Sequence, residues 1–301
     1  MSHYNFETPG HVRLRVDNKS GEVRLRARPG STTDVEVTGT GSSGQELEGG
    51  TRVEHQRDEG GSVHTVVVKV PVPQEFLRSL TTWGASVTVR VDLPEGADIE
   101  VSTAAGDIGA EGTYGKTRLG TASGDISVDR VSGDLNASTA SGEIRASLVE
   151  GKAELTTASG DVGCDLLHGP ARIRTASGDV TVREARAHIS TQTASGDVRV
   201  GELRDGCQLQ TASGDQELER AVSGRAELQT MSGDLAVGVP RGTDVAVDAE
   251  TLTGNLSSEI ELSAERPSNE PTSLAGTGPD GSHLELKART VTGDLVIKRV
   301  P

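Results

Sequence analysis

The sequence predicts an all-β protein folded as a parallel β-solenoid (β-helix), with about 18 residues and two strands per coil, at least ten coils and irregular capped ends. Three observations support this fold class. A pentapeptide recurs every eighteen residues, glycine recurs at half that spacing, and apolar residues keep the same place in successive repeats. A repeat this short cannot bury its own apolar side chains, so neighbouring repeats must stack into a continuous core.

Residues 1–100 are expected to form an N-terminal β region that continues the stack. Residues 11–16 and 23–26 alternate apolar and charged side chains, as half-buried strands do. Between them, the segment Ser-Gly-Glu-Val at 20–23 is similar to the turns of the later repeats.

A capping insertion is predicted at residues 73–84, where this alternation stops. Phe76, Leu80 and Trp83 are spaced as in a short helix. A cap is expected because an uncovered terminal coil exposes apolar side chains and unpaired strand edges. The alternative interpretation is an exposed partner-binding segment, since apolar clusters outside a core often mark interaction sites.

Residues 101–301 are expected to form the regular β-solenoid, with a flexible loop at 257–283 that is rich in proline and glycine. An aliphatic ladder is predicted after each turn, through Ile108, Ile126, Ile144, Val162, Val180 and Val198. On the other strand, large and small side chains exchange places between coils, which keeps the core volume nearly constant. Gln216 interrupts the first ladder, either as a polar residue tolerated in a coil one residue longer or as a local bulge.

One acidic residue per coil is predicted to form a column at one corner: Asp107, Asp125, Glu143, Asp161, Asp179, Asp197 and Asp215. Carboxylates about 4.8 Å apart repel each other by about 1 kcal/mol in water, so the column needs compensation. The structural interpretation is that each carboxylate accepts hydrogen bonds from turn amides or from the Ser and Thr of its own corner. Calcium bound between coils is the alternative, although one glycine per turn matches calcium-binding β-rolls poorly.

The net charge of −15 argues against nonspecific nucleic-acid binding, which depends on neutralising phosphates. The first thirty residues are nevertheless locally basic. Arg13, Arg15, Arg24 and Arg26 are therefore candidate contacts for an acidic partner, an anionic lipid surface or another copy, with a solvated strand face as the alternative.

The sequence predicts no enzyme, no catalytic or cofactor-binding residues and no cofactor. Its histidines show neither metal-ligand nor triad spacing, and aromatic residues make up only 2% of the chain, too few to suggest sugar platforms. Cys164 and Cys207 occupy core positions more than two coils apart, so they are expected to be small buried hydrophobes and not a disulfide.

The predicted location is cytoplasmic. No stretch approaches the roughly 20 apolar residues of a membrane span, so no integral membrane segment is expected. The first residues lack the basic and apolar regions of a signal peptide, and two lone thiols suit a reducing compartment.

Four sequence features together resemble the bacterial "putative adhesin" family, a domain of unknown function. They are the repeated Thr-Ala-Ser-Gly-Asp turns, Ser-Gly-Glu-Val at 20–23, Val-Arg-Val-Asp-Leu-Pro-Glu-Gly at 89–96 and Thr-Val-Thr-Gly-Asp-Leu at 290–295. The resemblance covers nearly the whole chain. It implies a β-solenoid and a scaffold or sensor associated with the cell envelope, and it supplies no catalytic residues.

The sequence therefore predicts a nonenzymatic interaction or assembly scaffold, linked to cell-envelope or stress function, which binds a protein partner or a second copy of itself. One alternative is an adhesin-like binder of surface glycans or envelope components. The other is a calcium-binding module similar to a β-roll, which depends on the acidic column.

Overall fold

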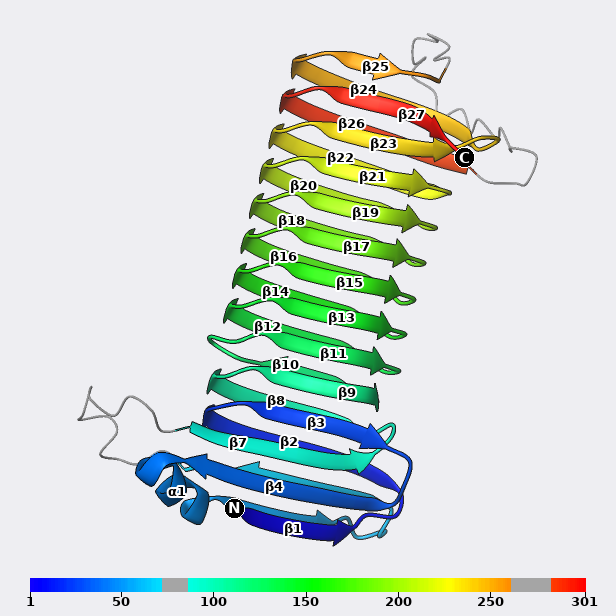
Figure 1. The fold of residues 1–301 in the computed structure, drawn as a ribbon. Helices are drawn as coiled ribbons and strands as arrows, with labels where there is room; N and C mark the ends of the chain where they lie inside the picture. Colours follow the sequence, from blue (N-terminus) through cyan, green and yellow to red (C-terminus); the bar gives the residue numbers. More distant parts are fainter. Residues whose placement is uncertain (72–85, 261–282) are drawn as a thin grey trace. The chain divides into compact units, whose positions relative to one another are not determined.

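The structure, a computed structural model, describes residues 1–71, 86–260 and 283–301. It confirms the predicted parallel β-solenoid (Figure 1). The chain forms two compact units, Met1–Gly160 and Asp161–Pro301. The predicted cap at 73–84, with Phe76, Leu80 and Trp83, lies outside the described residues.

The N-terminal unit contains fourteen of the strands and the helix α1. Their bounds are β1 Ser2–Glu7, β2 His11–Ser20, β3 Val23–Arg28, β4 Thr32–Thr40, α1 Gly41–Gly50, β5 Arg52–Arg57, β6 Val63–Lys69, β7 Ser86–Pro94, β8 Asp98–Ala105, β9 Ile108–Tyr114, β10 Thr117–Gly120, β11 Ile126–Val131, β12 Leu135–Ser141, β13 Ile144–Val149 and β14 Ala153–Ser159.

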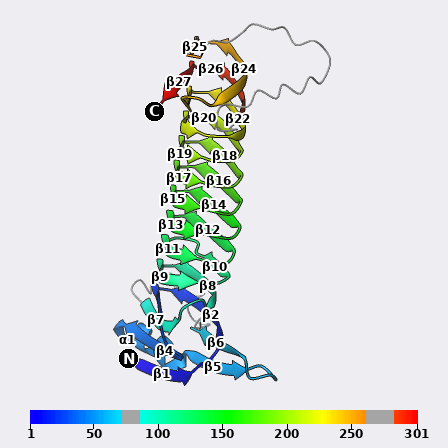
Figure 2. The same ribbon diagram turned by 90° about the vertical axis from the view of Figure 1, so that its right-hand side faces the viewer.

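These strands form two sheets, and each coil contributes one strand to each sheet. Within the N-terminal unit the orders are β1-β4-β7-β3-β9-β11-β13 and β5-β6-β2-β8-β10-β12-β14. The coil β2–β3 pairs in parallel with β8 and β9, while β6 and β7 lie on its other side (Figure 2). The outermost strands reverse direction, because β4 pairs antiparallel with β7, β1 with β4, and β5 with β6.

The C-terminal unit contains the remaining strands, again two to a coil. Their bounds are β15 Val162–Leu167, β16 Ala171–Ser177, β17 Val180–Ala185, β18 Ile189–Ser195, β19 Val198–Leu203, β20 Cys207–Ser213, β21 Gln216–Ala221, β22 Gly224–Ser232, β23 Leu235–Pro240, β24 Asp244–Thr253, β25 Leu256–Ser258, β26 His283–Thr292 and β27 Leu295–Val300.

The last coil in the sequence is not the last coil in the stack. The strand β26 pairs with both β22 and β24, and β27 pairs with both β23 and β25. The coil β24–β25 is therefore outermost, and the chain returns to insert β26–β27 beneath it (Figure 1). Of the loop expected at 257–283, residues 257 and 258 belong to β25 and His283 begins β26, while residues 261–282 lie outside the described residues.

The core follows the predicted ladders. Ile126 stands in register between Ile108 and Ile144, and all three side chains are buried. On the opposite sheet, Leu135 faces Ala153 while Ala137 faces Leu155, which confirms the exchange of large and small side chains.

Gln216 stays in the ladder, in register between Val198 and Leu235, so there is no bulge. Its buried side-chain amide donates to the Thr211 hydroxyl at 3.0 Å and to the Gln229 carbonyl at 2.8 Å. A polar residue is tolerated there because its donor group finds partners inside the coil.

Candidate interaction surfaces

The acidic column is held by hydrogen bonds between neighbouring coils. In the N-terminal unit, Asp107 Oδ1 accepts the backbone N–H of Asp125 at 2.9 Å, and Asp125 Oδ1 accepts that of Glu143 at 2.8 Å. In the C-terminal unit the same bond, at 2.7–2.8 Å, links Asp161 to Asp179, Asp179 to Asp197, Asp197 to Asp215, Asp215 to Asp234, Asp234 to Asp294 and Asp294 to Asn255.

The structural interpretation of the column is thus refined in one respect. Each of these aspartates accepts the amide of the equivalent residue in the next coil, and not an amide of its own corner, whereas the carboxylate of Glu143 pairs with Arg145. Charge-assisted hydrogen bonds of this kind offset the repulsion between successive carboxylates. Among the described residues, no group of three or more His, Cys, Asp or Glu side chains is arranged to hold a metal ion.

In most repeats the threonine joins the same corner to the neighbouring coil from inside, whereas Thr175 and Thr193 donate to the carbonyls of Ser177 and Ser195 in their own turns. Thr139 is buried, and its hydroxyl donates to the Gly124 carbonyl of the preceding coil at 3.2 Å. Thr121, Thr157, Thr251 and Thr290 donate in the same way to Gly106, Gly142, Gly293 and Gly233. The repeated pentapeptide therefore supplies coil-to-coil bonds, which accounts for its regularity without a bound ligand.

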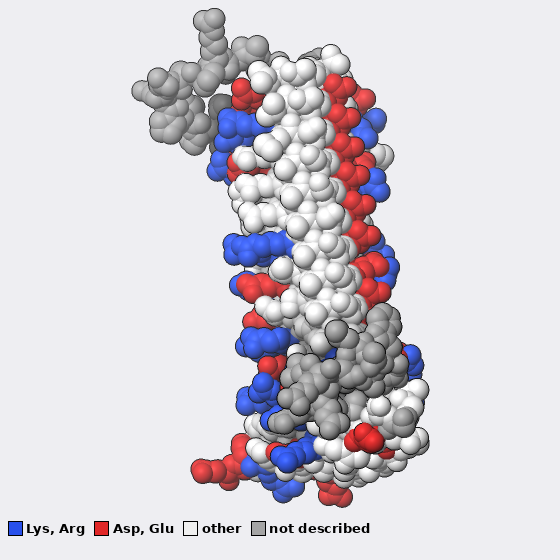
Figure 3. Space-filling view, turned by 90° about the vertical axis from the view of Figure 1, so that its left-hand side faces the viewer, with Lys and Arg blue, Asp and Glu red and all other residues white. Residues whose placement is uncertain are grey.

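Beside the acidic column, the outside of this corner forms an uncharged stripe (Figure 3). Exposed Ala and Ser side chains alternate there in most coils, for example Ala194 and Ser195. In the three outer coils of the C-terminal unit the alanine position holds Met231, Val291 and Leu252, which are 62%, 47% and 80% exposed.

Arg13 and Arg15 lie on β2, with side chains on the outer face of its sheet. They pair loosely with Asp98 and Glu100, each at 3.9 Å. The same face contains the exposed side chains of Lys116 and Arg118, for which no carboxylate lies within ion-pair distance among the described residues. A hollow of about 440 Å³ lies among these side chains, over Leu14 and Ile99.

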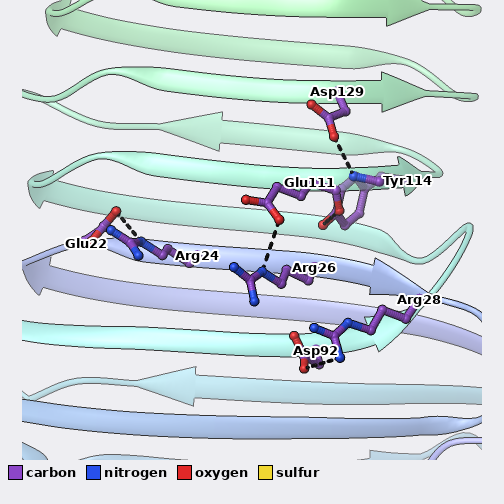
Figure 4. Close-up of polar contacts among 9 residues, drawn as sticks. Glu22, Arg24, Arg26, Arg28, Asp92, Glu111, Tyr114 and Asp129 are labelled. Carbon is purple, nitrogen blue, oxygen red and sulfur yellow. Dashed lines mark hydrogen bonds and ion pairs between the residues drawn. The ribbon is translucent and has the colours of Figure 1, made fainter.

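Arg24 and Arg26 lie on β3, in the other sheet, so the four predicted arginines do not form one surface. Arg24 pairs with Glu22, and Arg26 with Glu111 at 3.1 Å (Figure 4). On the same sheet, Arg28 pairs with Asp92 and Arg90 with Glu36. Most of the positive charge on this face is therefore neutralised locally.

Tyr114 anchors the strand under this face. Its buried hydroxyl donates to the Glu111 carbonyl at 2.9 Å, and burial raises the pKa of the phenol well above its usual value. Asp129 of the next coil accepts the backbone N–H of Gly112 at 2.9 Å (Figure 4). These bonds hold the strand that carries Glu111, the partner of Arg26.

Sequence reasoning missed Lys116 and Arg118 because they lie about a hundred residues from Arg13. The strand register brings them together. The strand β8 pairs with both β2 and β10, so Glu100 stands between Arg15 and Arg118. Only the known strand order brings these charges together.

Two histidines that the sequence left unassigned meet in the N-terminal unit. His55 Nε2 lies 3.0 Å from His64 Nδ1, the rings stack at 5.2 Å, and Phe6 lies against His55 at 5.1 Å. Burial lowers the pKa of His55, and the charges of His64 and Arg57 lower it further. This environment favours an uncharged His55 imidazole.

Both cysteines are free and buried, which confirms their predicted role as small hydrophobes. Burial raises the pKa of each thiol to about 12. Within the described ranges, no helix combines the length and apolar character needed to cross a membrane.

The family model described as Toastrack DUF4097 matches residues 11–223. No curated protein matches the chain. Among solved structures, a "putative lipid binding protein" from Parabacteroides distasonis is 12% identical and aligns over 99% of this chain and 96% of its own, with a TM-score of 0.42. A "putative adhesin" from Bacteroides fragilis is 11% identical over the same shares, with a TM-score of 0.32. A "putative cell adhesion protein" from Clostridium sporogenes is 9% identical over 99% of both chains, with a TM-score of 0.25.

Proposed function

We propose, from the premise that the chain belongs to the Toastrack DUF4097 family, that it is a nonenzymatic scaffold in the cytoplasm that binds an acidic protein partner. The repeated polar residues support this proposal because they form coil-to-coil hydrogen bonds, as Asp125 and Thr139 do. The repeated Asp and Thr residues thus hold neighbouring coils together. The other side chains on the outer faces of the sheets remain available to bind a partner.

The basic face of the N-terminal unit, defined as Arg13, Arg15, Lys116 and Arg118, is the observation that carries the proposal. Asp98 and Glu100 offset only part of this charge, and their distances to the arginines are long for ion pairs. Because these residues stand on paired strands, their backbone positions are set before binding, so only the side chains lose conformational freedom on association. A partner with clustered carboxylates matches the charge and the hollow between them.

The experiment is an affinity capture of the tagged full chain from cytosolic and membrane fractions of its host, analysed by mass spectrometry. The variant R15E/R118E reverses charge on the basic face. The matched control R24E/R26E makes the same charge change on the opposite sheet, where both arginines are already paired. A partner that is lost with R15E/R118E and retained with R24E/R26E is the expected result.

Equal capture by both variants would overturn the assignment of the basic face. Recovery of the protein from culture supernatant, with capture of surface glycans or envelope components in place of an acidic protein, would replace the proposed function with an adhesin-like one.

A further inference from the structure

We propose that the C-terminal unit has a second binding surface, which takes a basic amphipathic helix of a partner protein. Its centre is the apolar row, defined as the exposed residues Met231, Val291 and Leu252. The inference goes beyond the proposed function, because it uses another surface and a partner of opposite charge. It involves neither Arg15 nor Arg118, so the two proposals are tested separately.

The apolar row crosses three neighbouring coils at one corner. Thr290 stands in register with Thr230 on one side and with Thr251 on the other, so the residues that follow these threonines are also neighbours. In the other coils of the unit this position holds a small side chain, that of Ala176, Ala194 or Ala212. The larger side chains of the row point outward and fill no place in the core. Adjacent exposed apolar groups of this kind mark interaction sites.

The spacing of the apolar row fits a helix better than an extended strand. Parallel strands lie about 4.8 Å apart, so the three side chains of the row follow one another at about that interval. On a helix, apolar residues at i, i+3 or i+4, and i+7 recur with each turn, at about 5.4 Å. Side chains on one face of a strand are about 6.8 Å apart. A helix laid along the row therefore brings one apolar side chain to each coil.

A hollow of about 490 Å³ lies beside the row. The row forms part of its lining, together with the polar side chains of Gln210, Gln229, Glu250 and Arg289. An apolar centre with a polar rim is the usual composition of a protein interface. The hollow gives the apolar side chains of a docked helix a place beside the row.

Unpaired carboxylates border the row on the side of the acidic column (Figure 3). In Asp215, Asp234 and Asp294, one oxygen accepts a backbone amide of the next coil. No cationic side chain in the described ranges lies within ion-pair distance of these three residues. The next cation along β27 is Lys298, four residues after Asp294 and thus about 13 Å away along a strand. The second oxygen of each carboxylate is therefore free to pair with a lysine or arginine of the partner.

On the other side of the row, two cations stand among three carboxylates. Arg289 lies 3.8 Å from Asp248 and 3.6 Å from Glu250. Lys287 stands in register between Glu227 and Asp248. This flank therefore adds no positive charge that could offset the acidic column.

The surrounding charge selects the occupant. A basic helix gains ion pairs with the column, whereas an anionic bilayer places like charge against it. A second copy docked through the same row offers either its own acidic column or its flank with Arg289, where carboxylates already match the cations. Only a partner that combines apolar side chains with unpaired cations satisfies both parts of the surface.

The experiment measures binding of a designed probe, a fluorescein-labelled peptide of about 18 residues, which is long enough for five helical turns. Its leucines lie on one helical face, lysines flank them, and alanines fill the other positions. One comparison peptide has the same composition in scrambled order, and another has glutamate in place of lysine. Fluorescence anisotropy with the full chain at low salt is expected to give at least about tenfold tighter binding of the probe than of either comparison peptide.

The variant M231A/V291A/L252A gives the row the alanine of the other coils, and circular dichroism verifies its folding. We expect it to bind the probe about tenfold more weakly than the wild type, because apolar contact area is lost.

The variant D234N/D294N removes two charges beside the row but retains an acceptor oxygen for the amide of the next coil. We expect about threefold weaker binding at low salt, a loss that high salt abolishes. The matched control D161N/D179N makes the same change in the same column, away from the row, and is expected to bind like the wild type.

Undiminished binding by M231A/V291A/L252A would overturn the proposal, as would a wild type that does not prefer the probe to both comparison peptides. Two other results would replace the helix as occupant. Self-association in sedimentation velocity that the triple variant abolishes would assign the row to a second copy. Binding of anionic phospholipid vesicles that the triple variant abolishes would assign it to a membrane. None of these results affects capture of an acidic partner by the basic face.

Discussion

Asp197 Oδ1 accepts the backbone N–H of Asp215 in the next coil at 2.8 Å. The two residues are therefore joined by a side-chain-to-backbone hydrogen bond, although both carry negative charge. This relation recurs along the column, so the most conspicuous motif of the sequence is explained by coil stacking.

Replacing Asp197 tests this bond. We expect Asp197→Ala to lower the free energy of unfolding by about 1 kcal/mol, because the Asp215 amide loses its acceptor. Asp197→Asn retains an acceptor oxygen and is expected to lose less. Urea denaturation measures the difference, with Asp165→Ala as the control, since Asp165 makes only a loose exposed pair with Arg183 at 3.8 Å. Equal losses for Asp197→Ala and Asp165→Ala would contradict a structural role of the column.

Calcium is expected to leave the melting temperature unchanged. One oxygen of each aspartate in the column already accepts a backbone amide, Glu143 is paired with Arg145, and the described residues contain no metal-holding cluster. A cation that binds the folded state raises its stability by mass action. Thermal melts in millimolar calcium and in chelator check this, and a rise with calcium that the chelator reverses would restore the calcium-binding interpretation.

Gly106 marks a corner that accepts no side chain. Its φ is +152°, and a Cβ atom placed on it would lie 2.1 Å from the Gly21 carbonyl oxygen. We expect Gly106→Ala to destabilise the protein by at least about 2 kcal/mol, from backbone strain and steric overlap with main-chain atoms.

Gly109 is the matched control, because a Cβ there meets nothing within 4 Å. Thermal and urea unfolding of Gly106→Ala and Gly109→Ala make the comparison. Similar stability of the two variants would show that the corner adjusts to a side chain.

Stability is expected to fall with pH below about 6.5 because of His55. Its pKa is lowered in the folded state, mainly by burial and then by His64 and Arg57, so the unfolded chain takes up the proton more readily. The loss begins below the unfolded value and is complete below the folded one. Urea denaturation between pH 7.5 and pH 5 is the measurement.

The variant His55→Gln should show a weaker dependence on pH over this range. Substitution of the exposed His3 is the control and should leave the dependence as in the wild type. If the pH profile of His55→Gln matches that of the wild type, His55 is not the group responsible.

The sequence by itself determined the coil. Its eighteen-residue period, the glycine corners and the ladder through Ile108, Ile126 and Ile144 are local features, because each repeat must match its neighbour to bury the same side chains. The same reasoning identified the acidic column and the buried cysteines. It left open which amide each carboxylate accepts, since several lie near a turn.

Only the tertiary structure decided the order of the coils and the composition of the faces. The coil β26–β27 lies between the coils β22–β23 and β24–β25. The sequence of a coil does not show whether that coil is inserted between two others or added at the end of the stack. Arg13 and Arg24 are eleven residues apart and lie on opposite sheets, whereas Arg118 shares a face with Arg15. In a solenoid, distance along the chain specifies the place of a residue within its coil, but only strand pairing specifies which coils are neighbours.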